Sequence, residues 1–197
     1  MKNCIKLQGT IIHIFTTKTT TIITLFVGNK NYPEIYCFGK IKEYVDKYIA
    51  ENMNVNINCY IKNTKHESNN LIYYTQNIIA LNILEIKSNF SKIFNIKETQ
   101  FKDFKNEVYL YGTIEKIKSK QNGFIYFILK LKNTKHKTKL LIASPLMYEN
   151  LIQSNNDICL YANIQTKIKE IDNKIKRYET IVIKDISLLR KEIKNEI

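Results

Sequence analysis

The chain has 197 residues, of which 44% are hydrophobic, and it carries a formal net charge of +13 with a pI near 9.4. A chain of this length can bury the core of one or two domains, and it contains no apolar run long enough for a transmembrane helix. The basic excess favours a polyanionic partner, nucleic acid before an anionic membrane surface. Arginine occurs only at Arg177 and Arg190. Because lysine lacks the bidentate fork that reads guanine, this composition suits contact with a nucleic-acid backbone better than base-specific recognition.

Residue types with catalytic or metal-binding chemistry are scattered along the chain. The four cysteines, Cys4, Cys37, Cys59 and Cys159, form no C-x-x-C pair, and we expect them to be reduced core thiols. The histidines lack ligand spacing, the five glycines form no phosphate-binding loop, and no nucleophile–base arrangement stands out. The sequence therefore predicts no enzyme, no metal site and no cofactor. The N-terminus has no secretory signal pattern, which predicts a cytoplasmic or nucleoid-associated protein that is not secreted.

The first half of the chain predicts five strands and one helix. Apolar residues at i, i+3, i+4, i+7 and i+8 mark the helix, and we expect its Tyr44 and Tyr48 to pack in the core. Gly9 is expected where the first strand bends. The predicted elements are strands 4–15, 22–27 and 35–38, a helix at 41–50, strand 55–62, a polar loop at 63–70 and strand 71–86. A helix between the third and fourth strands of a small five-stranded barrel is the arrangement of the OB-fold, whose open face binds oligonucleotides.

The same order of elements recurs about 103 residues later. Gly9-Thr10-Ile11 returns as Gly112-Thr113-Ile114, and the alternating strand at 55–61 returns at 158–164. The remaining correspondences are 78–83 with 181–186, a second strand at 124–131, a third at 139–143 and a shorter helix within 144–154. We therefore predict an all-β fold with short helices, made of two tandem OB-fold domains, each a five-stranded Greek-key barrel. The predicted boundaries are residues 1–86 and 107–197, joined by a partly helical linker at 87–106.

Strand alternation separates candidate nucleic-acid contacts from core residues. Phe26 faces away from the apolar side of its strand, Tyr36 and Phe38 share a face of the next strand, and Tyr60 and Lys62 share an outward side. A base stacked on an aromatic side chain gains about 1–3 kcal/mol whatever the base, so such positions suffice for sequence-independent binding. Further candidates are Lys18, Tyr73 and Tyr74, and in the second copy Tyr126, Lys130, Tyr161, Arg177 and Tyr178. In the second copy we expect Ile142 in the place of Phe38, which leaves that copy with fewer stacking positions.

Several short segments in this order are similar to one known family. They are I-I-T-L-F-V at 22–27, E-I-Y-C-F-G-K at 34–40, the helix and fourth strand at 45–62, and K-R-Y-E-T-I-V-I-K-D-I-S-L-L at 176–189. Residues 21–84 resemble the bacterial-type single-stranded DNA-binding protein family most closely. The resemblance implies stacking positions at Tyr32, Phe38 and His66, and phosphate contacts at Lys40, Lys62 and Lys65. The chain differs from the family in having no Trp and in ending, at 191–197, without the acidic tip that recruits partners.

We expect a protein that binds and protects single-stranded DNA without sequence preference in replication, recombination or repair, through a basic groove with stacking aromatics. The resemblance implies four barrels in a working unit, and two per chain then imply a homodimer. Replication or repair proteins are possible further partners, and a membrane is not expected. Two alternatives remain open: a replication or primosome accessory protein whose barrels mainly bind protein, and an RNA-binding protein of the same fold.

Overall fold

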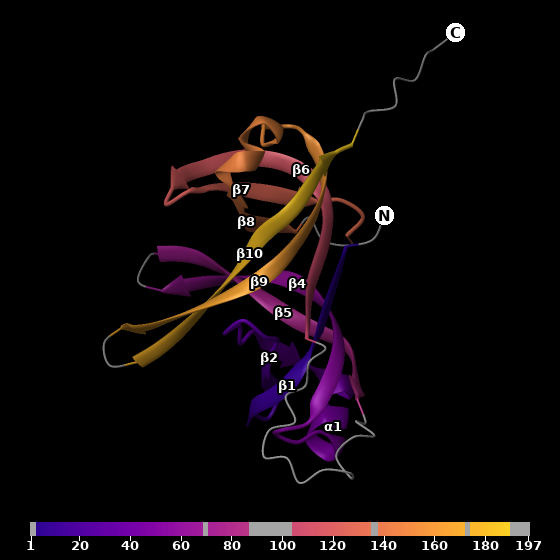
Figure 1. Cartoon of the computed structure of the whole chain (residues 1–197). Helices are drawn as coiled ribbons and strands as arrows, with labels where there is room; N and C mark the ends of the chain where they lie inside the picture. Colours follow the sequence, from indigo (N-terminus) through magenta and orange to yellow (C-terminus); the bar gives the residue numbers. More distant parts are fainter. Residues whose placement is uncertain (1–2, 69–70, 87–103, 135–137, 172–173, 190–197) are drawn as a thin grey trace. The chain divides into compact units, whose positions relative to one another are not determined.

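The computed structural model describes residues 3–68, 71–86, 104–134, 138–171 and 174–189, without the side chains of residues 64–74 and 169–177 (Figure 1). The chain divides into two compact units. The first unit comprises Cys4–Glu107 and Ile164–Glu179, and the second comprises Met1–Asn3, Val108–Asn163 and Thr180–Ile197. The linker predicted to be partly helical lies outside the described residues, apart from positions 104–106, of which 105 and 106 begin a strand.

Five strands and one helix come from the first half of the chain and lie in the first unit. They are β1 (Cys4–Thr16), β2 (Thr21–Phe26), β3 (Glu34–Cys37), α1 (Gly39–Tyr48), β4 (Asn54–Ser68) and β5 (Leu71–Glu85). Neighbouring strands follow the order β2-β3-β5-β4-β1, and β1 also pairs with β2, which closes the sheet into a barrel. All these pairs are antiparallel except β3–β5, which is parallel.

Strand β1 changes partners along its length. Residues 5–10 pair with β4, and residues 10–16 pair with β2. At the change, a Cβ on Gly9 would lie 2.0 Å from the carbonyl oxygen of Phe26, so only glycine allows the backbones of β1 and β2 to approach this closely. This contact gives a physical reason for the glycine at the predicted bend.

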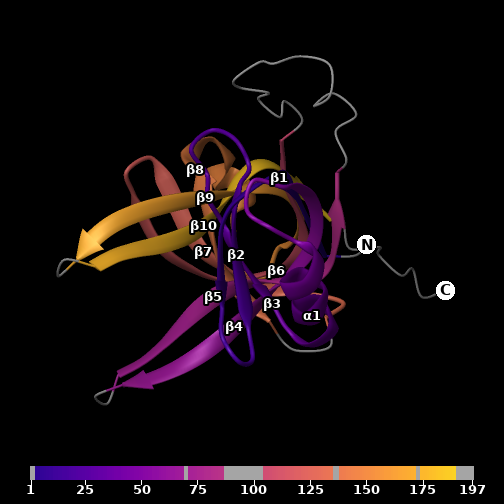
Figure 2. The same cartoon turned by 90° about the horizontal axis from the view of Figure 1, so that it is seen from below.

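Two local predictions for the first half are wrong. Residues 63–68 continue β4 rather than forming a loop, and β4 and β5 run together to the pair Ser68↔Leu71 (Figure 2). The helix tyrosines are exposed: Val45 and Ile49 are buried, whereas Tyr44 and Tyr48 pack on each other with ring centroids 5.2 Å apart. The apolar stripe on the helix is wider than the surface that the barrel covers, so its edge remains in solvent.

The second half of the chain repeats the strand order. Its elements are β6 (Lys105–Gln121), β7 (Phe124–Leu131), β8 (Lys139–Pro145), the 3₁₀ helix η1 (Leu146–Leu151), β9 (Asp157–Ile171) and β10 (Lys174–Leu188). The order is β6-β7-β8-β10-β9, closed by a β6–β9 pairing, with β8–β10 parallel. The predicted all-β class with short helices is confirmed over the described residues.

The cores consist of inward-facing aliphatic side chains from alternate strand positions. In the first unit Leu7, Ile23 and Ile57 are fully buried, and in the second Phe127 is the largest fully buried side chain. Cys37 and Cys59 belong to the first of these cores, as expected. The prediction is wrong for Cys4 and Cys159, which are only half-buried, since Cys4 begins β1 and Cys159 alternates with the buried Ile158 and Leu160. Burial, with a smaller effect from the charge of Asp46, raises the pKa of the Cys37 thiol to about 12. The thiol is therefore protonated at neutral pH and packs as an apolar group.

Candidate nucleic-acid interface

A row of side chains crosses the outer face of the first barrel at one level. The strand registers place Ile22 of β2 opposite Tyr36 of β3, Tyr36 opposite Ile79 of β5, and Ile79 opposite Tyr60 of β4. Side chains of directly paired residues lie on the same face of a sheet. Since Ile35, the chain neighbour of Tyr36, is fully buried, the row faces outward. Within the row Ile79 is only 8% exposed and Tyr36 is half-buried, so Tyr60 is its most exposed ring.

The predicted residues Phe38 and Lys62 lie beside this row, each two residues beyond one of its tyrosines. Phe38 follows Tyr36 by two residues in extended conformation, with φ −127° and ψ 159°, and its side chain is 45% exposed. Lys62 follows Tyr60 by two residues on β4, opposite Asn77, and is exposed. Tyr60 is 41% exposed. Exposed aromatic side chains and a lysine therefore occur on the same face, a combination that suits binding of a single strand by stacking and phosphate contact.

Lys18 and Lys40 are both exposed but belong to other elements. Lys18 lies in the turn between β1 and β2, which is closed by a hydrogen bond of 2.8 Å from the Thr17 amide to the Thr20 carbonyl. Lys40 lies in the first turn of α1, two residues beyond Phe38. Lysine in such positions acts on phosphates through charge rather than fixed geometry.

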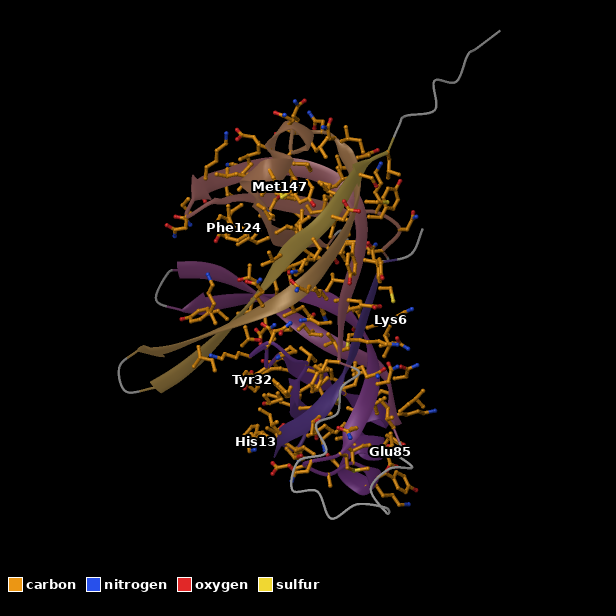
Figure 3. The ribbon with its side chains drawn as sticks, in the orientation of Figure 1. Lys6, His13, Tyr32, Glu85, Phe124 and Met147 are labelled. Atoms are coloured by element: carbon orange, nitrogen blue, oxygen red, sulfur yellow. The ribbon has the colours of Figure 1, made fainter. Side chains whose placement is uncertain are left out.

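Phe26 and Tyr32 form a second aromatic cluster at the far end of β2. Their rings stack with centroids 5.2 Å apart and planes at 30°, and Phe104 packs edge-on against Phe26 at 5.0 Å. All three side chains are half-buried. Figure 3 labels Tyr32 at this end of the unit. The two predicted stackers therefore contact one another, and each retains part of its surface in solvent.

The environment of Tyr36 keeps its hydroxyl group protonated. Burial is the largest effect that raises its pKa, and the carboxylates of Glu34 and Glu179 raise it further. A protonated phenol can donate a hydrogen bond to a phosphate or a base while its ring offers a stacking surface.

The second barrel carries its outward aromatics on β7. Phe124, Tyr126, Ile128 and Lys130 alternate with the buried residues Ile125, Phe127 and Leu129. Phe124, labelled in Figure 3, and Tyr126 lie with ring centroids 6.5 Å apart. The predicted residues Tyr126 and Lys130 thus share one face, and sequence reasoning missed Phe124, although it lies at the i−2 position that alternation would have indicated.

The strand registers correct one expected correspondence between the copies. Ile35 pairs with Ile78 in the first copy, and Ile142 pairs with Ile181 in the second. Ile142 therefore occupies the position of buried Ile35, and Pro145 occupies that of Phe38. At the level of Tyr36 the second copy has Ala143, while Tyr126 replaces Ile22 on the neighbouring strand. The hairpin of β7 and β8 is longer than that of β2 and β3, because its strands have 8 and 7 residues rather than 6 and 4, and this displaced the sequence alignment.

Tyr161 lies on another part of the second barrel. It is paired directly with Tyr109 of β6, and the two rings stack with centroids 5.1 Å apart and planes at 30°. Their exposed fractions are 37% and 42%. No register pair connects Tyr161 with Tyr126, so these two predicted residues do not form one platform. Tyr109 was not predicted, because pairing between distant strands is invisible in a single sequence.

The remaining predicted residues lie in the two long hairpins. Lys65 is paired with Tyr74 and His66 with Tyr73 in the β4–β5 register, but their side chains, like that of Arg177, lie outside the described part. Tyr178, on β10, is described and is 43% exposed. Phe104, from the predicted linker, is the third residue that sequence reasoning missed.

Metal-binding groups and membrane-spanning helices were both sought among the described residues. Among them, no group of three or more His, Cys, Asp or Glu side chains is arranged to hold a metal ion. No helix among them has the length and hydropathy needed to cross a bilayer.

Comparison with known proteins identifies the fold. No family model matches the chain, and no curated protein matches it by sequence. A variant of the single-stranded DNA binding protein from Thermus aquaticus, with a deletion and a substitution, matches with a TM-score of 0.70 and 10% identity, over 100% of this chain and 98% of that chain. The wild-type Thermus aquaticus protein matches with a TM-score of 0.65 and 11% identity, over 96% and 94% of the two chains. The chain therefore has the fold of the single-stranded DNA binding protein from Thermus aquaticus.

Proposed function

We propose that this protein binds single-stranded DNA without sequence preference and protects it during replication, recombination or repair. The observation that carries the proposal is the likeness of fold over the full length of a protein that binds single-stranded DNA. The repeat in the sequence and the two closed five-stranded sheets support a tandem arrangement of OB barrels at 1–86 and 107–197, joined at 87–106. The protein acts by binding rather than by catalysis.

In the first barrel, the proposed interface is the row that contains Tyr36 and Tyr60, extended by Phe38 and Lys62. Bases stack on the exposed rings, and each well-placed stack contributes about 1–3 kcal/mol. Lys62, with Lys40 and Lys18 on neighbouring elements, attracts the phosphates. The prevalence of lysine over arginine fits binding that follows the backbone and does not discriminate between bases.

In the second barrel, the proposed interface is smaller and lies on β7. Phe124 and Tyr126 provide adjacent rings, and Lys130 lies further along the same face. The positions equivalent to Phe38 and Tyr36 are Pro145 and Ala143, which offer no ring for stacking. The first barrel therefore supplies more of the stacking energy, and the second contributes mainly charge.

The test is fluorescence anisotropy with labelled dT oligonucleotide, an RNA oligonucleotide of the same length and duplex DNA, each at low and moderate salt. We expect tight dT binding, weak duplex binding, and an affinity that falls linearly with salt on logarithmic axes. Tyr60→Ala should weaken dT binding by about tenfold, while Tyr48→Ala, which removes an exposed tyrosine of α1, serves as the matched control.

Three results would contradict the proposal in different ways. RNA binding equal to dT binding would favour the RNA-binding alternative. No binding to any of the three nucleic acids would leave a protein-interaction role for the barrels. Equal losses of dT affinity in Tyr60→Ala and Tyr48→Ala would show that the row on β3, β5 and β4 is not the interface.

A further inference from the structure

The first unit contains a segment from the second half of the chain. Residues 164–179, which we call the arm, are the outer parts of β9 and β10, and they belong to the same compact unit as residues 4–107. The arm begins after Asn163 and ends before Thr180, where the chain returns to the second unit. The predicted second domain, residues 107–197, contains the whole of this hairpin, together with the candidate Tyr178.

Thr166 binds the loop between β2 and β3 through two hydrogen bonds of opposite direction. The backbone N–H of Tyr32 donates to Thr166 Oγ1 at 3.1 Å, and the backbone N–H of Thr166 donates to Asn31 Oδ1 at 3.2 Å. A pair of bonds between two adjacent residues and a single partner fixes both position and direction. The loop end that carries Tyr32 is therefore held by the arm, and we call these two hydrogen bonds the clamp.

Two further contacts hold the arm on either side of this clamp. The side-chain amide of Asn106 donates to the carbonyl of Ile164 at 2.7 Å and accepts from the Ile164 N–H at 2.8 Å. A carboxylate oxygen of Glu179 accepts from the backbone N–H of Glu34 at 3.2 Å. Bonds at both ends of the arm prevent it from sliding along the loop.

The clamped residue belongs to an aromatic stack. Tyr32 packs on Phe26, and Phe26 packs on Phe104. Within the loop, backbone bonds from the Asn31 N–H to the Gly28 carbonyl at 3.0 Å and from the Val27 N–H to the Asn31 carbonyl at 3.1 Å fix the turn. With the bond from the Leu25 N–H to the Pro33 carbonyl at 3.0 Å, these bonds fix the residues on both sides of Tyr32, whose own N–H is bound by the arm.

We propose that Thr166 is a positioning residue for the Tyr32–Phe26 stack, and that the stack is a base-binding platform completed by the arm of the second repeat. This inference rests on the proposed function, since it requires a single-stranded nucleic acid as ligand. A ring that is ordered before the ligand arrives does not lose its conformational freedom on binding, so the clamp increases affinity without touching the nucleic acid. The second half of the chain thereby contributes to binding at the first barrel.

The experiment compares Thr166→Val, which keeps the shape but removes the hydroxyl acceptor, with Thr166→Ser, which keeps the acceptor. Thr113→Val is the matched control, because it also removes a threonine hydroxyl hydrogen-bonded within a strand, here 2.6 Å from Asp157 Oδ1 in the second unit. Affinity for dT oligonucleotide should fall about twofold to tenfold in Thr166→Val, as expected for one hydrogen bond, and return in Thr166→Ser.

Two readouts distinguish positioning from general loss of stability. In a double-mutant cycle, Thr166→Val should have no effect on dT affinity once Tyr32 is replaced by Ala, because the ring that it positions is gone. In the free protein, amide hydrogen exchange at Tyr32 should accelerate in Thr166→Val and not in Thr113→Val.

The outcomes separate this inference from the proposed function. Suppose that the wild-type protein binds dT, but that Thr166→Val binds it as tightly as Thr113→Val does, or that the effects of Thr166→Val and Tyr32→Ala on affinity are additive. Either result overturns the positioning role while the proposed function stands. If the wild-type protein does not bind dT, both the proposed function and the platform are overturned. Unchanged exchange at Tyr32 in Thr166→Val would overturn the clamp by itself.

Discussion

Asp46 fastens α1 to the first barrel. Its carboxylate accepts a hydrogen bond of 2.6 Å from the hydroxyl of buried Thr21 and a longer one of 3.4 Å from Thr16, and it pairs with Lys42 one turn earlier. The bond with Lys42 is the largest of the effects that lower the pKa of Asp46, followed by the bond with Thr21. The ionised carboxylate is therefore the form that the native state favours.

We expect Asp46→Asn to lower stability at neutral pH and to flatten its acid dependence. Because the native pKa is depressed, this carboxylate contributes its full stabilisation above the ordinary Asp value of 3.8, and the contribution disappears as pH falls through the native pKa. Thermal melting from pH 7 to pH 2 measures the effect, with Glu43→Gln on the same helix as the control. Parallel curves for Asp46→Asn and wild type would contradict this linkage.

At the residue scale, the sequence predicted which strand side chains face outward, but not which side chains contact one another. Alternation placed Phe38, Tyr60 and Lys62 on the outer face because their strands have one buried side. Phe104 was assigned to a linker because its contact with Phe26 joins distant parts of the chain. Tyr44 and Tyr48 were assigned to the core because helical periodicity gives the direction of an apolar face but not how much of it is covered.

At the scale of elements, the two strand glycines Gly9 and Gly112 have the same role in each barrel. A Cβ on Gly112 would lie 2.4 Å from the carbonyl oxygen of Lys130, as one on Gly9 would lie 2.0 Å from that of Phe26. Each glycine allows the first strand of its barrel to approach the second. The repeat that the sequence showed thus reflects a repeated backbone contact.

Gly9→Ala and Gly112→Ala should each destabilise the protein by about 3 kcal/mol or more, because backbone rather than a flexible side chain must move. Gly123→Ala is the comparison: its φ of +78° makes alanine strained, but no atom lies within 4 Å of the added Cβ. Its cost should be about 1–2 kcal/mol. Chemical denaturation measures the free energy of unfolding of all three variants. Equal losses of stability would refute the role of the close approach between the strands.

The extent of the hairpins could not be predicted from the sequence. The sequence predicted a loop at residues 63–68 because N-T-K-H-E-S shows no alternation of apolar and polar positions. Alternation arises only where one face of a strand is buried against a core. The order of strands, by contrast, follows from the buried parts, and the predicted β7, residues 124–131, agrees with the structure at both ends.

At the scale of the whole molecule, both halves of the chain carry net positive charge. Residues 1–98 contain 12 basic and 7 acidic side chains, and the remainder contains 19 and 11. Both repeats thus carry a basic excess that suits phosphate contact, and we expect the first to contribute more of the stacking.

The resemblance to a family whose working unit has four barrels leads us to expect a homodimer. Light scattering should give a mass twice that of the 23.3 kDa chain, at protein concentrations where dT binding is complete. Adding dT should raise this mass only by that of the bound oligonucleotide, since we expect the dimer to form before binding. A mass of one chain under both conditions would refute the dimer.

The clamp of the first unit also has a consequence for the order in which the protein is made. Thr166, whose hydroxyl oxygen accepts a hydrogen bond from the amide of Tyr32, lies 134 residues further along the chain. At roughly 5–20 residues per second, about 7–27 s of translation separate the two residues. The first barrel therefore emerges from the ribosome before the segment that completes it, and its loop at Tyr32 reaches its final form only when most of the second repeat has been synthesised.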